Sequence, residues 1–273
     1  MAQFLLSLDA CTDDADEVIE IPAGITAIGE GAFENKRLLK KVVLPEGVRE
    51  IRARAFSGCV NLESIVLPST LEVIGKEAFR GCWRLEEAII PEGVRELPER
   101  VFIRCRRLAR VALPASLERI GMQCFRHCAA LEEAALPQGI TALEDGAFQD
   151  CLALQRISLP ENLVEMGNDA FGGCSDLKSL ALPENLMWIG QRCFKDCTAL
   201  ETISIPGEVR SIEEAVFENC RSLMQVSLPE GIEFIDARAF KGCPRISQAN
   251  LPETVLQNAQ IAPDAFEPPK PIA

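Results

Sequence analysis

Residues 45–67 read PEGVREIRARAFSGCVNLESIVL, and the same pattern recurs along most of the chain. A proline opens each copy, and the prolines from Pro22 to Pro252 stand 23 residues apart, which gives ten units over residues 22–251 without insertion or deletion. When the proline is counted as position 1, position 12 is phenylalanine in all ten units and position 15 is cysteine in nine. A fixed period of this kind predicts a repeat solenoid, in which stacked units bury one continuous core.

The spacing inside one unit predicts the path of one coil. Leu62, Ile65 and Leu67 show the alternation that is typical of the end of a short strand. Residues 55–62 (AFSGCVNL) place apolar side chains three apart, as a helical or 3₁₀ turn does. Repeats made of two helices need about 33–47 residues, which excludes them here. We therefore expect about ten 23-residue coils, whose strands form a parallel sheet.

The two ends of the chain depart from the repeat, as capping units do. Residues 1–21 are expected to form an N-terminal cap, a degenerate coil with a strand at Val18–Ile21 and an acidic approach before it. At the other end, residues 261–266 echo residues 28–33 after three extra residues. Residues 252–273 are therefore expected to form a partial final coil and a proline-rich tail.

The repeated phrases identify a family resemblance. L-x-x-I-x-L-P at residues 62–68 and A-F-x-x-C-x-x-L at residues 78–85 resemble the BspA-like (Treponema pallidum type) leucine-rich repeats, over residues 22–266. The resemblance implies a right-handed superhelix with a concave parallel sheet and short strands or 3₁₀ turns on the convex side. It also implies bacterial or protist surface proteins, several of them linked to adhesion. The chain departs from ordinary leucine-rich repeats, because proline follows the strand where they have asparagine.

Composition excludes several classes of function. The chain has 28 basic and 41 acidic residues, a net charge of −13, which disfavours binding to nucleic acid or to anionic lipid. It shows neither a leader nor an apolar run long enough to enter a membrane. We expect a cytoplasmic protein, from the missing leader and the many free cysteines; the family resemblance favours the cell surface or secretion as the alternative.

The cysteines and the single histidine do not predict an active site. Cys124 and Cys128, and also Cys193 and Cys197, have the spacing of zinc ligands, but both pairs fall on positions that face the predicted core. We interpret them as small buried hydrophobes and expect no disulfides. His127 lies on a turn position with no nucleophile motif beside it. No catalytic residue, metal or cofactor is therefore expected.

An arginine-rich edge is the first candidate binding surface. Residues 91–136 carry eight arginines and six glutamates in an otherwise acidic chain. Several arginines fall on positions 13–17 of adjacent coils, beside a tryptophan, and guanidinium groups suit carboxylate or phosphate partners. Two interpretations remain open, a solvated face and a docking site for an acidic partner. The residues of this edge are Arg80, Trp83, Arg84, Arg104, Arg106, Arg107 and Arg126.

The outward face of the concave sheet is the second candidate. Positions 20 and 22 of each unit point away from the core if positions 21 and 23 point into it. Position 22 is apolar in the early units and position 20 is charged, so an apolar stripe with a charged rim is predicted there. Simple strand propensity also explains these residues. The candidate binding residues are Lys41, Val43, Ser64, Val66, Glu87, Ile89, Arg110, Glu133 and Arg156.

The sequence therefore predicts a non-catalytic, monomeric scaffold that binds a protein or peptide partner on its concave face. Two alternatives remain open at this point. One is a bacterial cell-surface adhesin, a host-protein-binding module that lacks its leader here. The other is a purely structural spacer.

Overall fold

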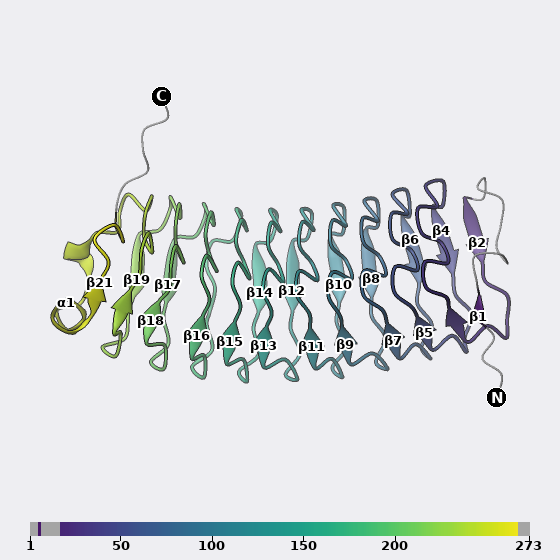
Figure 1. Ribbon diagram of the computed structural model, residues 1–273, viewed down its shortest axis with the longest axis horizontal. Coiled ribbons are helices and arrows are strands. Elements are labelled where there is room, and N and C mark those ends of the chain that lie inside the picture. Colours follow the sequence, from purple (N-terminus) through teal and green to yellow (C-terminus); the bar gives the residue numbers. More distant parts are fainter. Residues whose placement is uncertain (1–4, 7–16, 267–273) are drawn as a thin grey trace, which may run out of the picture.

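The protein is a parallel β-solenoid of about eleven turns. The computed structural model describes residues 5–6 and 17–266. Figure 1 shows the coils side by side along one long axis, with the first and the last described coils at opposite ends of the stack. The repeat solenoid predicted from the 23-residue period is confirmed.

Most coils contain one long strand of three residues, at positions 20–22 of the unit. These strands form the surface that we call the long-strand face. They are β2 (Val18–Glu20), β4 (Lys41–Val43), β6 (Ser64–Val66), β8 (Glu87–Ile89), β10 (Arg110–Ala112), β12 (Glu133–Ala135), β14 (Arg156–Ser158), β17 (Thr202–Ser204) and β19 (Gln225–Ser227). Residues 179–181 form no strand, and Ser179 makes only an isolated bridge to Thr202.

Each coil also contains a second strand of two residues, which was not predicted from the sequence. Two residues are too few to show alternation, so the sequence carries no signal for them. They form the short-strand face. They are β1 (Leu5–Leu6), β3 (Ala27–Ile28), β5 (Glu50–Ile51), β7 (Val73–Ile74), β9 (Glu96–Leu97), β11 (Arg119–Ile120), β13 (Ala142–Leu143), β15 (Glu165–Met166), β16 (Trp188–Ile189), β18 (Ser211–Ile212), β20 (Phe234–Ile235) and β21 (Gln260–Ile261).

Equivalent residues of successive coils lie opposite one another in both faces. Val42 pairs with Ile65 in the long strands, and Ile51 pairs with Ile74 in the short ones. All these pairings are parallel. Because the period is 23 residues in all ten units, a residue type that recurs in the sequence becomes a column in space.

The third side of each coil, positions 9–18, is a turn face. The N–H groups of Phe56 and Gly58 donate to carbonyls of the next coil, at Ala78 and Arg80, over 2.8 and 2.7 Å. Between them run turns with i to i+3 bonds, such as Cys59 N–H to the Phe56 carbonyl. These are the predicted 3₁₀ turns, held as separate turns and not joined into a helix.

Two left-handed residues in every coil separate these turns. Positions 10 and 14 of all ten units have φ between 54° and 79°. Many of them are not glycine, although this conformation costs an ordinary residue roughly 1–2 kcal/mol. The non-glycine examples are Asn35, Arg54, Glu77, Arg100, Arg104, Gln123, His127, Asp150, Asp169, Arg192, Asp196, Ala215, Asn219 and Arg238.

A column of phenylalanine rings fills the core. Each ring from Phe33 to Phe240 lies parallel to the next, with centroids 5.1 to 5.8 Å apart, and all ten are almost completely buried. Phe266 stacks on Phe240 at 5.2 Å and extends the column by one ring. Residues 261–266, whose sequence resembles residues 28–33, therefore place Phe266 in the same column as Phe33.

The ladders of both strand faces are interrupted around the third unit, and each has a second interruption further along, between β16 and β18 on the short-strand face and at residues 179–181 on the long-strand face. β6 and β8 belong to different hydrogen-bonded sheets, and so do β7 and β9. On the short-strand face Pro98 removes one bond of the first interruption, because the equivalent N–H groups of Gly75 and Gly121 donate to the preceding coil at 2.7 and 2.8 Å and proline has no N–H. The turn face stays bonded at this level, through Phe79 N–H to the Val101 carbonyl.

The ends carry partial coils. β2 pairs with β4 in parallel register, so the chain before Pro22 adds a strand to the long-strand face. In the tenth unit a 3₁₀ turn (Gln248–Asn250) takes the place of the long strand, and after this unit the helix α1 (Glu253–Asn258) leads into β21, which pairs with β20. The acidic approach at residues 7–16 and the tail at 267–273 lie outside the described residues.

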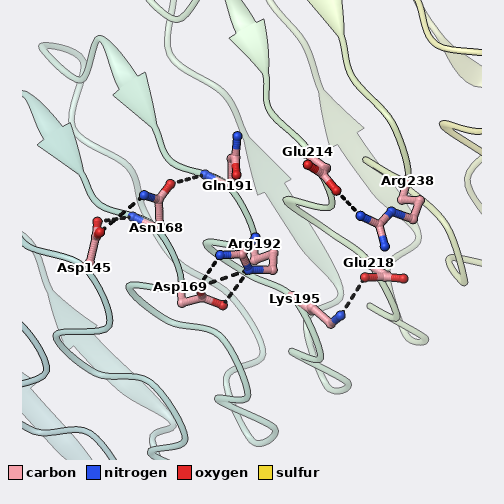
Figure 2. Close-up of polar contacts among 9 residues, drawn as sticks. All are labelled: Asp145, Asn168, Asp169, Gln191, Arg192, Lys195, Glu214, Glu218 and Arg238. Carbon is pink, nitrogen blue, oxygen red and sulfur yellow. Dashed lines mark hydrogen bonds and ion pairs between the residues drawn. The ribbon is translucent and has the colours of Figure 1, made fainter.

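A ladder of polar side chains joins coils on the turn face (Figure 2). Asn168 donates its backbone N–H to Asp145 over 2.7 Å, and its side-chain oxygen accepts the N–H of Gln191 over 2.9 Å. The Gln191 side chain has no such contact in Figure 2.

Asn168→Ala is expected to lower the free energy of unfolding by about 1–2 kcal/mol, because it leaves the partly buried N–H of Gln191 without an acceptor. Gln191→Ala, at the same repeat position one coil further on, is the matched control and should change it by less than about 0.5 kcal/mol. Urea denaturation of the two variants measures the difference. Equal losses would show that the ladder does not stabilise the turn face.

Candidate binding surfaces

The long-strand face presents the side chains that the alternation predicted. In β8, Glu87 and Ile89 are exposed and Ala88 is buried between them. Val66 and Ile89 occupy position 22 of adjacent coils and are 53% and 62% exposed. Val43, one coil earlier, is half-buried and therefore less exposed than Val66 and Ile89. The apolar column at position 22 is therefore centred on β6 and β8.

The charged column beside it is neutralised within the chain. Arg110 lies between Glu87 and Glu133 in the parallel register and donates to Glu87 over 3.2 Å. Arg156 is paired with Glu133 at 2.9 Å. Lys41 and Ser64 precede this run on the same column and are exposed. The charged side chains between residues 87 and 156 form ion pairs with one another along the rim. The apolar column beside them has no such contacts with the described residues.

The arginine-rich edge divides into paired and unpaired groups. Most of its guanidinium groups lie within 4.0 Å of a carboxylate, so their charges are balanced inside the chain. The pairs are Arg80 with Glu77 at 3.1 Å, Arg84 with Glu63 at 3.6 Å, Arg107 with Glu86 at 3.8 Å and Arg126 with Asp150 at 3.9 Å. Such exposed pairs contribute little to stability.

Arg104 and Arg106 form the unpaired group. Within the described part of the chain, neither guanidinium has a carboxylate within 4.0 Å. Arg106 lies over the ring of Trp83, with its guanidinium carbon 5.1 Å from the ring centroid, and Trp83 is 45% exposed. These two arginines are therefore the free cations of the edge.

A shallow trough of about 410 Å³ opens beside them on the turn face. Its floor contains Gly58 and Gly81, and its walls include Trp83 and Arg104. Arg37, from the first coil, completes the opposite wall. Arg37 was not predicted from the sequence because it lies outside the arginine-rich unit; the glycines at position 14 of two adjacent units were the available signal.

The cysteines form a structural ladder. All eleven cysteines in the described residues are buried and unpaired. At position 15, each thiol donates to the carbonyl of the phenylalanine one coil earlier, as Cys128 does to Phe102 over 3.2 Å. Burial raises the pKa of ten of these thiols, that of Cys59 to about 12. They are poor nucleophiles and poor metal ligands in this state, which agrees with their interpretation as buried hydrophobes.

No constellation suited to catalysis comes together in the described residues. His127 lies on the turn face at φ 61°, with Nδ1 3.3 Å from Asp150. No group of three or more His, Cys, Asp or Glu side chains in the described ranges is arranged to hold a metal ion. A groove of about 650 Å³ opens where Pro98 interrupts the short-strand ladder, but its charged groups are paired, Arg95 with Glu118 and Lys76 with Glu99 at 2.6 Å.

Among residues 5–6 and 17–266, no helix is long and apolar enough to cross a membrane.

Parallel coils with recurring leucine and phenylalanine layers define a leucine-rich repeat protein, a class whose solenoids serve as protein-interaction scaffolds and are typically not enzymes. The chain belongs to the BspA-type family: residues 12–132 and 141–269 match the family described as "BspA type Leucine rich repeat region (6 copies)". The resemblance inferred from the repeated phrases is confirmed.

Solved bacterial structures share this architecture. A leucine-rich repeat protein from Bacteroides ovatus is 28% identical, with a TM-score of 0.68, over 92% of this chain and 74% of that one. The leucine-rich repeat protein of Treponema pallidum is 35% identical, with a TM-score of 0.57, over 59% of this chain and 78% of that one. No curated protein matches the chain.

Proposed function

We propose that the protein is a non-catalytic scaffold that binds a protein or peptide partner on its long-strand face, centred on β4, β6 and β8. One observation carries this proposal. Val66 and Ile89 are more than half exposed on adjacent coils, although the repeat tolerates small polar residues at the same position, such as Ser204 and Ser227 further along. A core cannot use this side of the strand, so the apolar side chains serve something outside the chain.

The surroundings of the apolar column support the proposal. The rim charges from Glu87 to Arg156 are paired with one another. A partner that covers the apolar column therefore does not have to supply charges that neutralise them. A partner would dehydrate the apolar side chains, which stabilises a complex by roughly 25 cal/mol for each Å² removed from water. A few such anchors dominate most interfaces.

The test uses linear peptides selected from a displayed library on the intact protein. Val66→Glu/Ile89→Glu is expected to weaken their binding at least tenfold, because a partner would have to bury two carboxylates against an apolar surface. Ser204→Glu/Ser227→Glu is the matched control at the same repeat position, and it should leave the affinity unchanged. Fluorescence anisotropy with the labelled peptides measures both.

Two outcomes would contradict the proposal. If the selected peptides bound all variants equally, the partner surface would lie elsewhere on the solenoid. If no peptide bound saturably, the chain would be a structural spacer. Because the substituted side chains are exposed, the variants are expected to fold normally. Circular dichroism of the variants shows whether unfolding causes any lost binding.

A further inference from the structure

The trough on the turn face is lined mainly by hydrogen-bond donors. Gly58 and Gly81 have no side chains, and a Cβ placed on Gly81 would meet nothing closer than the indole nitrogen of Trp83 at 3.8 Å. Arg37 and Arg104 stand on its two sides. Among the lining residues only Glu34 carries a carboxylate. A cavity with this composition favours an anionic occupant.

The guanidinium groups around the trough differ in whether a carboxylate of the chain pairs with them. The whole protein has a net charge of −13, so carboxylates are abundant, and they neutralise the neighbouring Arg80 and Arg84. In the described residues no carboxylate lies within 4.0 Å of Arg104 or Arg106. The guanidinium groups of Arg104 and Arg106, like those of Arg221 and Arg245 in later coils, are therefore open to a counter-charge from another molecule.

His127 reports the positive field of this edge. Partial burial lowers the pKa of His127, and the charges of Arg126, Arg104 and Arg106 lower it further, while Asp150 acts in the opposite direction. The positive charges of these three guanidinium groups therefore extend to His127, next to the trough.

The arginines that line the trough are spread over several coils, which favours an extended peptide over a small anion as the ligand. Arg37 belongs to the first coil and Arg104 to the fourth, and these coils follow one another at 5.1 to 5.5 Å in the phenylalanine column. A peptide in extended conformation rises about 3.3 Å per residue, so about five residues cover this length. Trp83, already beside Arg106, offers an aromatic surface between the cations.

We propose that the trough and the free arginines Arg104 and Arg106 bind an extended acidic peptide segment of a partner protein, with its carboxylates on Arg37, Arg104 and Arg106 and an apolar side chain against Trp83. This site is separate from the long-strand face. The two proposals are therefore independent of each other. The variant Ile89→Glu, on the long-strand face, is expected to leave peptide binding in the trough unchanged.

The experiment uses a labelled seven-residue peptide of six glutamates around one phenylalanine, with the full chain, in fluorescence anisotropy. Arg104→Asn/Arg106→Gln removes both charges, and asparagine tolerates the left-handed backbone at position 104 (φ 63°). We expect at least tenfold weaker binding. Arg221→Gln, at the same repeat position as Arg106 but five coils away, is the matched control and should bind as the unchanged protein does.

A second variant tests the trough itself without changing any charge. Gly81→Asn fills the open space, and asparagine occupies the same left-handed position in other coils, as Asn35 and Asn219. We expect this variant to weaken binding severalfold. In the unchanged protein, the bound peptide should raise the pKa of His127, which proton NMR follows directly because the chain has one histidine.

Three results would overturn the proposal. The first is unchanged affinity of Arg104→Asn/Arg106→Gln for the acidic peptide. The second is equal binding of a control peptide in which lysines replace the glutamates. The third is saturable binding of a sulfated oligosaccharide together with no binding of the acidic peptide, which would assign the site to a glycan.

Discussion

Above pH 9 the fold is expected to lose stability steeply. Burial raises the pKa of ten of the eleven cysteines in the described residues, and the pKa of Cys59 reaches about 12. In the unfolded chain a thiol ionises near pH 8.5. Between these two values the unfolded chain has lost the thiol proton and the folded chain still holds it.

The sign of the effect follows from proton binding. Because the folded pKa of each thiol is raised, its contribution to stability is fully present below the unfolded pKa and falls as the pH rises through the interval. The slope is about 1.4 kcal/mol per pH unit for each thiol. Ten thiols together give a slope of about 14 kcal/mol per pH unit, which matches or exceeds the whole stability of a typical domain.

Urea denaturation at pH 7.0, 8.5, 9.5 and 10.0, in the presence of a reductant, measures this slope. The variant Cys105→Ala/Cys128→Ala/Cys151→Ala is the control, because it removes three of the ten contributing thiols and should flatten the slope by about three-tenths. Position 15 accepts a residue other than cysteine, as Lys36 shows. An unchanged denaturation midpoint from pH 7 to pH 10 would contradict the expectation.

The same thiols also limit what the sequence says about location. Free cysteines indicate a reducing compartment only if their thiols could form disulfides or be oxidised in an oxidising one. The thiols from Cys59 to Cys243 are all buried, and the nine at position 15 are bonded to carbonyls of the preceding coil, so they would stay reduced in either environment. The proposal of a cytoplasmic protein therefore has no support from them.

The fold was predictable because its order is carried by an unbroken period. Phe56, Phe79 and Phe102 had to form a column if each coil contains 23 residues, and their rings lie 5.5 and 5.3 Å apart. The short strands and the left-handed residues were not predictable in the same way. Position 10 is occupied by glycine, arginine, glutamate and alanine in different coils, so the backbone there is imposed by bonds between coils and not by residue preference.

The candidate surfaces were predictable in position but not in charge. Repeat phase placed Arg84, Arg104 and Arg106 on one edge. Which of them is neutralised depends on side chains from other positions, such as Glu63, which pairs with Arg84 across the coils. The bond lost at Pro98 was likewise not predictable from the repeat, because none of the other nine units has proline at position 8.

Replacement of a central ring of the column is expected to destabilise the fold more than any other single substitution proposed above. Phe125 is completely buried, between Phe102 at 5.6 Å and Phe148 at 5.2 Å. Phe125→Ala removes both stacking contacts and leaves a cavity in the continuous core, so we expect the free energy of unfolding to fall by about 3–5 kcal/mol.

A phenylalanine outside the column supplies the matched control. Phe234 is 47% exposed on the short-strand face, and Phe234→Ala should cost less than about 1 kcal/mol. Thermal and urea denaturation of both variants give the comparison. Since each coil contacts only its neighbours, the damage in Phe125→Ala should also appear locally, as faster hydrogen exchange in the coils on either side of residue 125 than near residues 33 and 240. Equal losses for the two variants, or exchange that accelerates uniformly along the chain, would mean that cohesion in this solenoid does not depend on the stacked rings.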